Sequence, residues 1–221
     1  MKLKSALIII LSIFALSSCG PNKEEKAQNM AANTLKGILF HFDSYEPLET
    51  KVDSLHSSLA TDKEAINLTI DMLKLFQSAE EYAEKVERAE KSMEVWSPNT
   101  YSSTFGKGQY RRATEDRDGY QRRLEKTRDR IKKQFSLIKE RQEAISEGKF
   151  DGWFVYHKFK SLNGPATVYI FGEYIFICDS EFKERMAYPK EEYDAICKIM
   201  TAISTSNDVP EMIEKLQEEI F

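Results

Sequence analysis

The strongest constraint on the fold is a seven-residue repeat of aliphatic side chains inside a long charged stretch, residues 109–148. The repeat comprises Leu124, Ile131, Ile138 and Ile145, with Tyr120 and Phe135 on the same side of the expected helix. A helix cannot bury so narrow a stripe by itself, and the pattern is typical of a coiled-coil arm packed against an antiparallel partner. We therefore expect one long helix here and a second elsewhere in the chain.

The expected partner is the stretch 66–96, in which apolar residues keep helical spacing until Ser97-Pro98. The capping-box pattern Thr61 to Glu64 marks the start of this helix. Residues 63–94 hold five basic against eight acidic side chains, whereas residues 107–141 hold thirteen against six. Opposite local charge favours a helical hairpin whose arms attract each other. Exposed ion pairs contribute only ~0.5 kcal/mol each, so charge would set register more than stability.

Helices should dominate the remaining chain, because only 9 Gly and 6 Pro are present and a β-sandwich needs more turns. Apolar residues recur at threes and fours over 25–42. They recur at steps of four, three and four from Leu48 to Leu59. Both stretches are therefore predicted to be amphipathic helices.

In the last third of the chain, the spacing of the side chains changes from a helical period to alternation. Side chains alternate over 153–159, and a turn signal follows at Asn163 to Pro165. Two β-rich runs, 166–171 and 174–178, are separated by Gly172-Glu173. Helices are then expected after Pro189 and after Asp208. The predicted fold class is α+β: mainly a helical bundle with a long antiparallel helical hairpin, and a small antiparallel sheet of two or three strands near the C-terminus.

The first twenty residues form a separate signal. Lys2 and Lys4 precede a ten-residue apolar run, 6–15, which is too short to cross a ~30 Å hydrocarbon core as a helix. The sequence Leu16-Ser17-Ser18-Cys19 then resembles the lipobox of bacterial lipoproteins. That resemblance implies cleavage before Cys19 and acylation of this cysteine. Several acyl chains on one residue anchor a protein stably to a membrane.

Further patterns resemble lipoproteins of the Bacteroidetes. Lys23-Glu24-Glu25 is similar to the acidic export signal that follows the lipidated cysteine in that phylum, although the same residues fit a solvated linker that opens the first helix. The tripeptide that begins at Asp53 fits the phylum's O-glycosylation pattern, with Ser54 as acceptor. The stretches 45–54 and 152–159 resemble an uncharacterised family of bacteroidete lipoproteins, which implies no activity.

These observations predict the domain organisation. Residues 1–18 are the expected signal peptide and 19–26 a lipidated tether. Residues 27–221 are expected to form a single α+β domain, with a helical part at 27–148 and a β-meander plus C-terminal helices at 149–221.

The sequence contains no recognisable catalytic motif. The chain has three histidines, but it lacks the motifs of zinc proteases, serine hydrolases, P-loops and dinucleotide-binding sites. Asp53 and His56 would share a face of the helix expected there, but we predict no metal and no cofactor. Cys178 and Cys197 have three interpretations: two buried thiols, a disulfide, or a reactive pair.

The basic arm suggests a ligand. The candidate anion-binding residues are Arg111, Arg112, Arg122 and Arg123, which would be left over after pairing with the acidic helix. The first two lie close to the Gly-rich turn where the acidic partner ends. Arginine binds phosphate and carboxylate groups in a bidentate manner, which suits a lipid headgroup or an acidic glycan. The alternative is a solvated helix paired with an acidic neighbour. The formal net charge of −4 and the export signal argue against nucleic acid.

The expected function is therefore that of a lipid-anchored envelope protein at the outer membrane or cell surface. We expect it to bind or scaffold an anionic ligand or a protein partner without catalysis. The rival hypothesis is an envelope hydrolase of unrecognised type. A deep pocket with convergent polar groups would favour the hydrolase, and a shallow surface with exposed aromatic side chains would favour binding.

Overall fold

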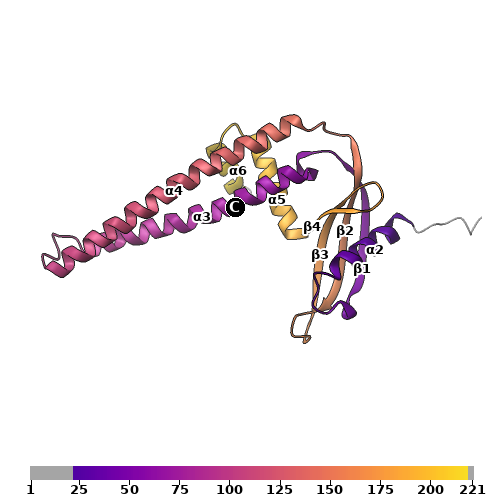
Figure 1. The fold of residues 1–221 in the computed structure, drawn as a ribbon, viewed down its shortest axis with the longest axis horizontal. Coiled ribbons are helices and arrows are strands. Elements are labelled where there is room, and N and C mark those ends of the chain that lie inside the picture. The colour runs from indigo at the N-terminus through magenta and orange to yellow at the C-terminus, as the bar shows by residue number, and fades with distance from the viewer. Residues whose placement is uncertain (1–21, 219–221) are drawn as a thin grey trace, which may run out of the picture. The chain divides into compact units, whose positions relative to one another are not determined.

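The structure is a computed structural model that describes residues 22–218. The chain forms two compact units. The sheet unit combines the stretch up to His56 with Lys149–Tyr193, and the hairpin unit combines Ser57–Gly148 with the stretch from Asp194 onward. The predicted α+β class, with a long antiparallel helical hairpin and an antiparallel sheet, is confirmed (Figure 1).

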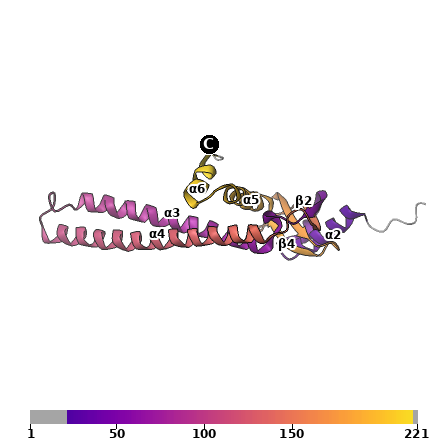
Figure 2. The same ribbon diagram turned by 90° about the horizontal axis from the view of Figure 1, so that it is seen from above.

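The sheet unit consists of one helix and four antiparallel strands in the order β1-β2-β3-β4. Its elements are α2 (Lys23–Leu35), the short 3₁₀ turn η1 (Phe42–Ser44), β1 (Glu46–His56), β2 (Phe150–Leu162), β3 (Tyr169–Cys178) and β4 (Glu184–Pro189). Helix α2 lies across one face of the sheet (Figures 1 and 2).

Alternation along the strands places the core beneath α2. Ala27, Ala31 and Leu35 recur every four residues on α2 and are fully buried. They pack with residues from one face of the sheet and its β3–β4 turn, namely Val155, Phe159, Phe176, Cys178 and Phe182. Small alanines at two of the three helix positions allow the helix to approach the sheet closely.

The start of α2 shows where the expected tether becomes helical. The Asn22 side chain caps the helix by accepting a hydrogen bond from the Glu25 amide at 2.8 Å. Glu24 and Glu25 lie in the first turn, where negative charge is favourable beside the helix N-terminus. The last four residues of the tether predicted at 19–26 are therefore helical.

The helix predicted from Leu48 to Leu59 is wrong, because residues 46–56 form strand β1. Two register shifts interrupt the β1–β2 pairing: the first leaves Leu48 as an extra residue in β1, and the second leaves Asp151 as an extra residue in β2. The extra residue Leu48 breaks the period-two alternation of β1, and Val52 and Leu55, three positions apart, lie on opposite faces of the strand. The steps of four, three and four therefore do not mark one helical face. The predicted helical part, 27–148, is thus interrupted by a strand, and the sheet has four strands rather than two or three.

The separation of two β-rich runs at Gly172-Glu173 is also wrong, because β3 runs without interruption through both residues. A Cβ at position 172 would lie 2.4 Å from the Phe159 ring, so this glycine makes room for an aromatic side chain on the neighbouring strand. The sequence analysis also missed β4, which pairs with β3 from Tyr174 to Cys178. Residues 169–173 of β3 therefore have a strand on one side only among the described residues.

The hairpin unit is built on two long antiparallel helices, α3 (Lys63–Val95) and α4 (Thr104–Ala144), which lie side by side in both views (Figures 1 and 2). The predicted stripe is buried in the seam between them: Leu124, Ile131, Phe135 and Ile138 are at most 6% exposed. The opposing buried residues on α3 are Ala65, Ile66, Thr69, Met72 and Leu75. Ile145 lies just past the end of α4 and is half-buried.

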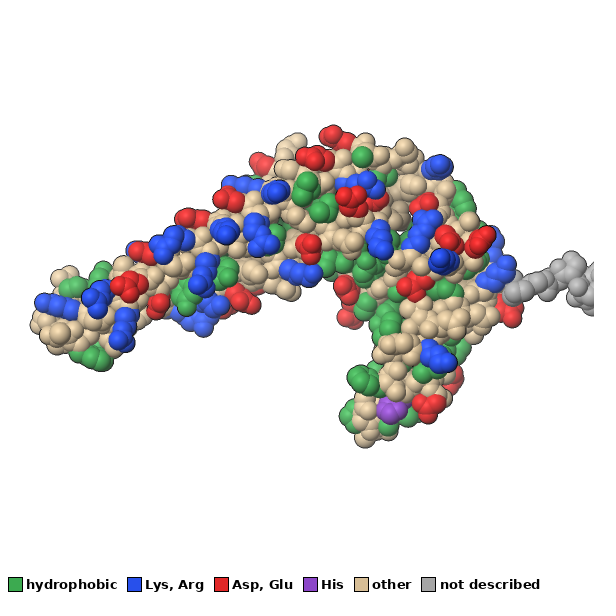
Figure 3. Space-filling model, viewed as in Figure 1, with side chains coloured by type: hydrophobic (Ala, Val, Ile, Leu, Met, Phe, Trp, Pro, Cys, Tyr) green, Lys and Arg blue, Asp and Glu red, His purple; other side chains and the backbone are tan. Residues whose placement is uncertain are grey.

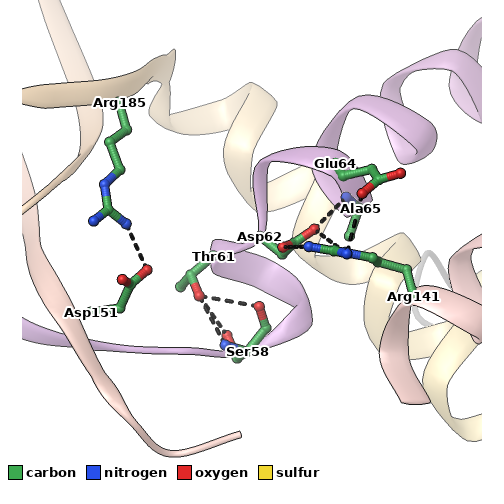
Figure 4. Close-up of polar contacts among 8 residues, drawn as sticks. All are labelled: Ser58, Thr61, Asp62, Glu64, Ala65, Arg141, Asp151 and Arg185. Atoms are coloured by element: carbon green, nitrogen blue, oxygen red, sulfur yellow. Dashed lines mark hydrogen bonds and ion pairs between the residues drawn. The ribbon is translucent and has the colours of Figure 1, made fainter. Parts of the chain in front are cut away.

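An ion pair joins the two arms at the base of the hairpin. Arg141 donates to both carboxylate oxygens of Asp62, from Nε at 2.9 Å and from Nη2 at 2.6 Å, and Nη1 lies 3.3 Å from Glu64 (Figure 4). Asp62 also caps α3 by accepting from the Ala65 amide at 2.9 Å. These bonds hold the pKa of Asp62 below its usual range, the Arg141 contact being the largest cause.

Farther from the base of the hairpin, the ion pairs of the described helices lie within each arm and not between the two arms. Along the described helices, ion pairs such as Lys85 with Glu81 and Arg88 with Glu84 join residues of the same helix, one turn apart. Such pairs support each helix by ~0.3–0.5 kcal/mol. The apolar seam and the Arg141 cluster therefore set the register of the two arms.

Two C-terminal helices complete the chain, α5 (Lys190–Thr205) and α6 (Val209–Glu218). The predicted cap at Asp208 is confirmed, since its side chain accepts from the Glu211 amide at 3.0 Å. Within the hairpin unit, Lys139 of α4 donates to the Ser204 carbonyl at 3.1 Å. This bond ties the end of α5 to the hairpin near its base.

Candidate functional site

The outer half of the hairpin carries an open groove between α3 and α4. Its volume is about 430 Å³, and its lining residues are Lys85, Arg88, Ala89, Ser92, Gln109, Arg112, Ala113, Asp116 and Tyr120. Alanines at 89 and 113 are nearly buried in the seam here, so the larger side chains around them form the walls. Three cations thus surround a shallow site that holds one carboxylate.

The three cations in this groove differ in whether they form ion pairs. Arg88 donates to Glu84 at 3.2 Å, and Lys85 lies 3.6 Å from Glu81. Arg112 forms no ion pair with any residue that the structure describes. Its exposed guanidinium, which has five N–H donors, is therefore the group in the groove that is best able to bind an anion.

The four arginines predicted from the sequence do not form one site. All are exposed on α4, but only Arg112 lines the groove. Arg111 lies 4.0 Å from Glu115, and the Arg123 guanidinium carbon lies 6.0 Å from the centre of the Tyr120 ring. Arg111 and Arg122 are eleven residues apart, which is about three helical turns or ~16 Å. The two arginine pairs therefore form two separate clusters along the helix.

The end of the hairpin presents aromatic side chains to solvent. The Trp96 ring lies 5.1 Å from Tyr101 and 5.6 Å from Phe105, measured between ring centres. Tyr101 is 43% exposed, Phe105 66% and Val95 56%. We call these four residues the aromatic tip. Figure 3 shows hydrophobic side chains at this outer end, with Lys and Arg beside them.

The loop that carries the aromatic tip is held by specific contacts. The Thr100 and Tyr101 amides both donate to the Ser97 carbonyl, at 2.8 and 2.9 Å. Ser103 caps α4 by accepting from the Gly106 amide at 3.1 Å. A Cβ at position 106 would lie 2.7 Å from the Tyr101 Cβ, so a glycine is needed for this close approach. These contacts define the backbone conformation of the loop that presents the exposed rings.

A polar cluster in the sheet unit involves a fully buried histidine. His157 lies between the Tyr45 hydroxyl, 2.7 Å from Nε2, and the Thr50 hydroxyl, 2.9 Å from Nδ1. Burial lowers the pKa of His157 to about 4 and raises that of Tyr45 to about 12. The neutral ring is satisfied when Tyr45 donates to Nε2 and Nδ1–H donates to Thr50. With both ring nitrogens engaged and no exposed surface, His157 is a structural residue.

The remaining sequence-predicted residues are scattered. Cys19 lies outside the described residues. Ser54 is exposed on the edge strand β1, where its hydroxyl lies 3.3 Å from His56 Nε2. Asp53 and His56 do not share a helix face, because this segment is a strand.

Cys178 and Cys197 are not joined by a disulfide, so the disulfide interpretation is wrong. Cys178 is buried, and burial raises its pKa to about 12, so this thiol is poorly suited to nucleophilic chemistry. Cys197 is only half-buried.

The sequence analysis missed the aromatic tip. It took Trp96 only as the last apolar residue of the first arm of the expected hairpin. One signal was present: no charged residue occurs from Val95 to Gly106, although charged residues make up 31% of the chain. A turn between two charged helices that contains aromatics and no charge is unusual for a solvated loop.

Comparisons with protein-family models, curated proteins and solved structures found no match. None of the helices described at 22–218 is long and apolar enough to cross a membrane. The same residues contain no cluster of three His, Cys, Asp or Glu side chains suited to a metal ion.

Proposed function

We propose that the protein is a lipid-anchored cell-envelope protein that binds an anionic ligand on its helical hairpin. The anchor rests on the lipobox-like sequence Leu16 to Cys19. The binding role rests on Arg112, an exposed guanidinium without an ion pair in the described chain, in an open groove that it shares with Lys85 and Arg88. An outer-membrane position, facing the periplasm or the exterior, is part of the proposal.

Binding fits the geometry better than hydrolysis. The cavities described in the hairpin unit are open to solvent, with volumes of about 390 to 450 Å³. The cavity at the hairpin base is lined by Asp62, Glu64 and Arg141, which are bonded to one another. A hydrolase needs a base and a nucleophile that converge on an accessible site.

The anchor is tested by lipid labelling. In bacteria fed a fatty-acid probe, the natural protein is expected to incorporate label and fractionate with membranes. Cys19→Ser should abolish the label, whereas Cys197→Ser should retain it. Equal labelling of the Cys19→Ser protein would refute the anchor.

The ligand site is tested on the unlipidated chain from Gly20 to Phe221. We expect binding of an acidic glycan or lipopolysaccharide that weakens about tenfold in Arg112→Gln, because a charge-assisted hydrogen bond contributes ~1.5–3 kcal/mol. The matched control is Arg122→Gln, an exposed arginine on the same helix, outside the groove. Equal effects of the two substitutions would exclude a site centred on Arg112.

A further inference from the structure

The aromatic tip exposes apolar surface at the turn between α3 and α4. Phe105 occupies the first turn of α4, directly after the Ser103 cap, and its ring remains 66% exposed. Full burial of a phenylalanine side chain stabilises a protein by ~1.5–3 kcal/mol, so this exposure is costly for an isolated domain. Exposed apolar patches of this kind mark interaction sites.

The chemistry of the aromatic tip suits the interface of a bilayer. Trp and Tyr rings concentrate at the headgroup level of membranes, because they are apolar with one polar group. The tip holds one of each in contact, together with a phenylalanine that can reach the acyl boundary. The segment 95–106 contains no charge that burial would have to desolvate.

The residues that flank the aromatic tip are complementary to anionic lipid. From Glu87 to Arg112 the chain carries five basic and three acidic side chains. Lys107 and Arg112 are exposed, and neither forms an ion pair within the described chain. Basic residues near a membrane surface contribute ~1 kcal/mol each when the lipid is anionic. On the α3 side, Arg88 and Lys91 are ion-paired with Glu84 and Glu87, so the positive charge available to lipid phosphates beside the tip lies on α4.

We propose that the aromatic tip docks into the interface of an anionic bilayer, with Trp96, Tyr101 and Phe105 at headgroup depth and Lys107 and Arg112 on lipid phosphates. This inference rests on the proposed function, because it names a membrane as the anionic partner of the hairpin. It gives the protein a second membrane contact, independent of the anchor on Cys19.

Trp96 provides a direct readout, because the chain has two tryptophans and the other can be replaced. In a Trp153→Phe background, the unlipidated chain from Gly20 to Phe221 is mixed with vesicles of phosphatidylcholine and phosphatidylglycerol in equal parts. We expect a blue shift of Trp96 emission and quenching by lipids brominated near the headgroup. Vesicles of phosphatidylcholine alone should give at least tenfold weaker partitioning, as should 1 M salt with the anionic vesicles.

A matched pair of substitutions locates the contact. Phe105→Ser removes an aromatic ring that is 66% exposed, and Phe171→Ser removes one that is 68% exposed on β3 of the sheet unit. Partitioning should fall about tenfold in Phe105→Ser and stay unchanged in Phe171→Ser. The double variant Lys107→Gln and Arg112→Gln should lose the preference for anionic lipid.

Several results would overturn the proposal. These are unshifted Trp96 emission on anionic vesicles, equal effects of Phe105→Ser and Phe171→Ser, or a response to glycerol phosphate in solution without one to vesicles. The last result would indicate a soluble phosphate site instead of a docking surface. Fatty-acid labelling of Cys19 and glycan binding through Arg112 are measured without vesicles, so failure at the aromatic tip is distinguishable from failure of the proposed function.

Discussion

At the scale of single residues, His157 shows how burial determines chemistry. A histidine in a strand of aromatics is compatible with catalysis, metal binding or a structural role when only the sequence is known. Tyr45 and Thr50 settle its role by bonding both ring nitrogens. Neither partner is recognisable from the sequence, because both lie more than 100 positions away along the chain.

The buried ring makes the stability of the protein depend on pH. The pKa of His157 is about 4 in the folded protein, against 6.5 for an unperturbed histidine. Between these values the unfolded chain binds a proton that the folded chain does not, so the free energy of unfolding falls as the pH falls. The loss from this group approaches ~3 kcal/mol below pH 4. Urea unfolding of the natural protein and of His157→Gln measures it at pH 7 and pH 4.5.

The variant should be less stable at pH 7, because it loses well-formed buried hydrogen bonds. Its stability should nevertheless change less between pH 7 and pH 4.5 than that of the natural protein. Equal pH dependence in both proteins would show that His157 titrates normally in the folded state.

At the scale of secondary-structure elements, a helix with local periodicity was predicted correctly, whereas a strand that depends on pairing with a distant segment was missed. The seven-residue repeat predicted α4 and its buried seam, because helical periodicity is visible within the chain segment itself. Strand β1 was missed because its partner β2 begins only at Phe150, and because the apolar residues of β1 fall at steps that also fit a helix. The aromatic tip was missed because exposure depends on the absence of a neighbouring segment, and the lack of charge from Val95 to Gly106 indicates this only indirectly.

The seam between the arms provides a stability test. Ile138 is fully buried on α4, so Ile138→Ala should lower the free energy of unfolding by ~2–5 kcal/mol. The matched control is Lys133→Ala, an exposed position on the same helix, where a change within ~0.5 kcal/mol is expected. Chemical denaturation followed by circular dichroism measures both. Similar small effects would mean that the seam opens in solution.

At the scale of the whole molecule, the chain enters the hairpin from one strand and returns to the neighbouring strand. β1 ends at His56, β2 begins at Phe150, and the two strands are paired. Closing a loop of this length costs only slightly more than closing a shorter one, since the entropy grows with the logarithm of length. The hairpin itself brings its ends together, because the Gly148 amide donates to the Ser57 carbonyl at 3.0 Å.

This topology predicts that the outer hairpin can be removed. A variant in which a short glycine-rich turn joins Tyr82 to Tyr120 deletes the aromatic tip and keeps the Asp62–Arg141 contact and the buried Ile131 and Ile138. We expect it to fold with the sheet unit unchanged, as reported by the amide chemical shifts of β1 to β4. Loss of the sheet signals would show that the outer arms are required for folding.

The hydrogen bond between Ser57 and Gly148 also has an evolutionary consequence. Because both ends of the hairpin are fixed at its base, insertions or deletions of seven residues in each arm preserve the apolar stripe and leave the sheet untouched. Each such pair changes the reach of the hairpin by about 10 Å, at ~1.5 Å per residue. The length of the hairpin is therefore a quantity that selection can adjust in whole steps, independently of the sheet.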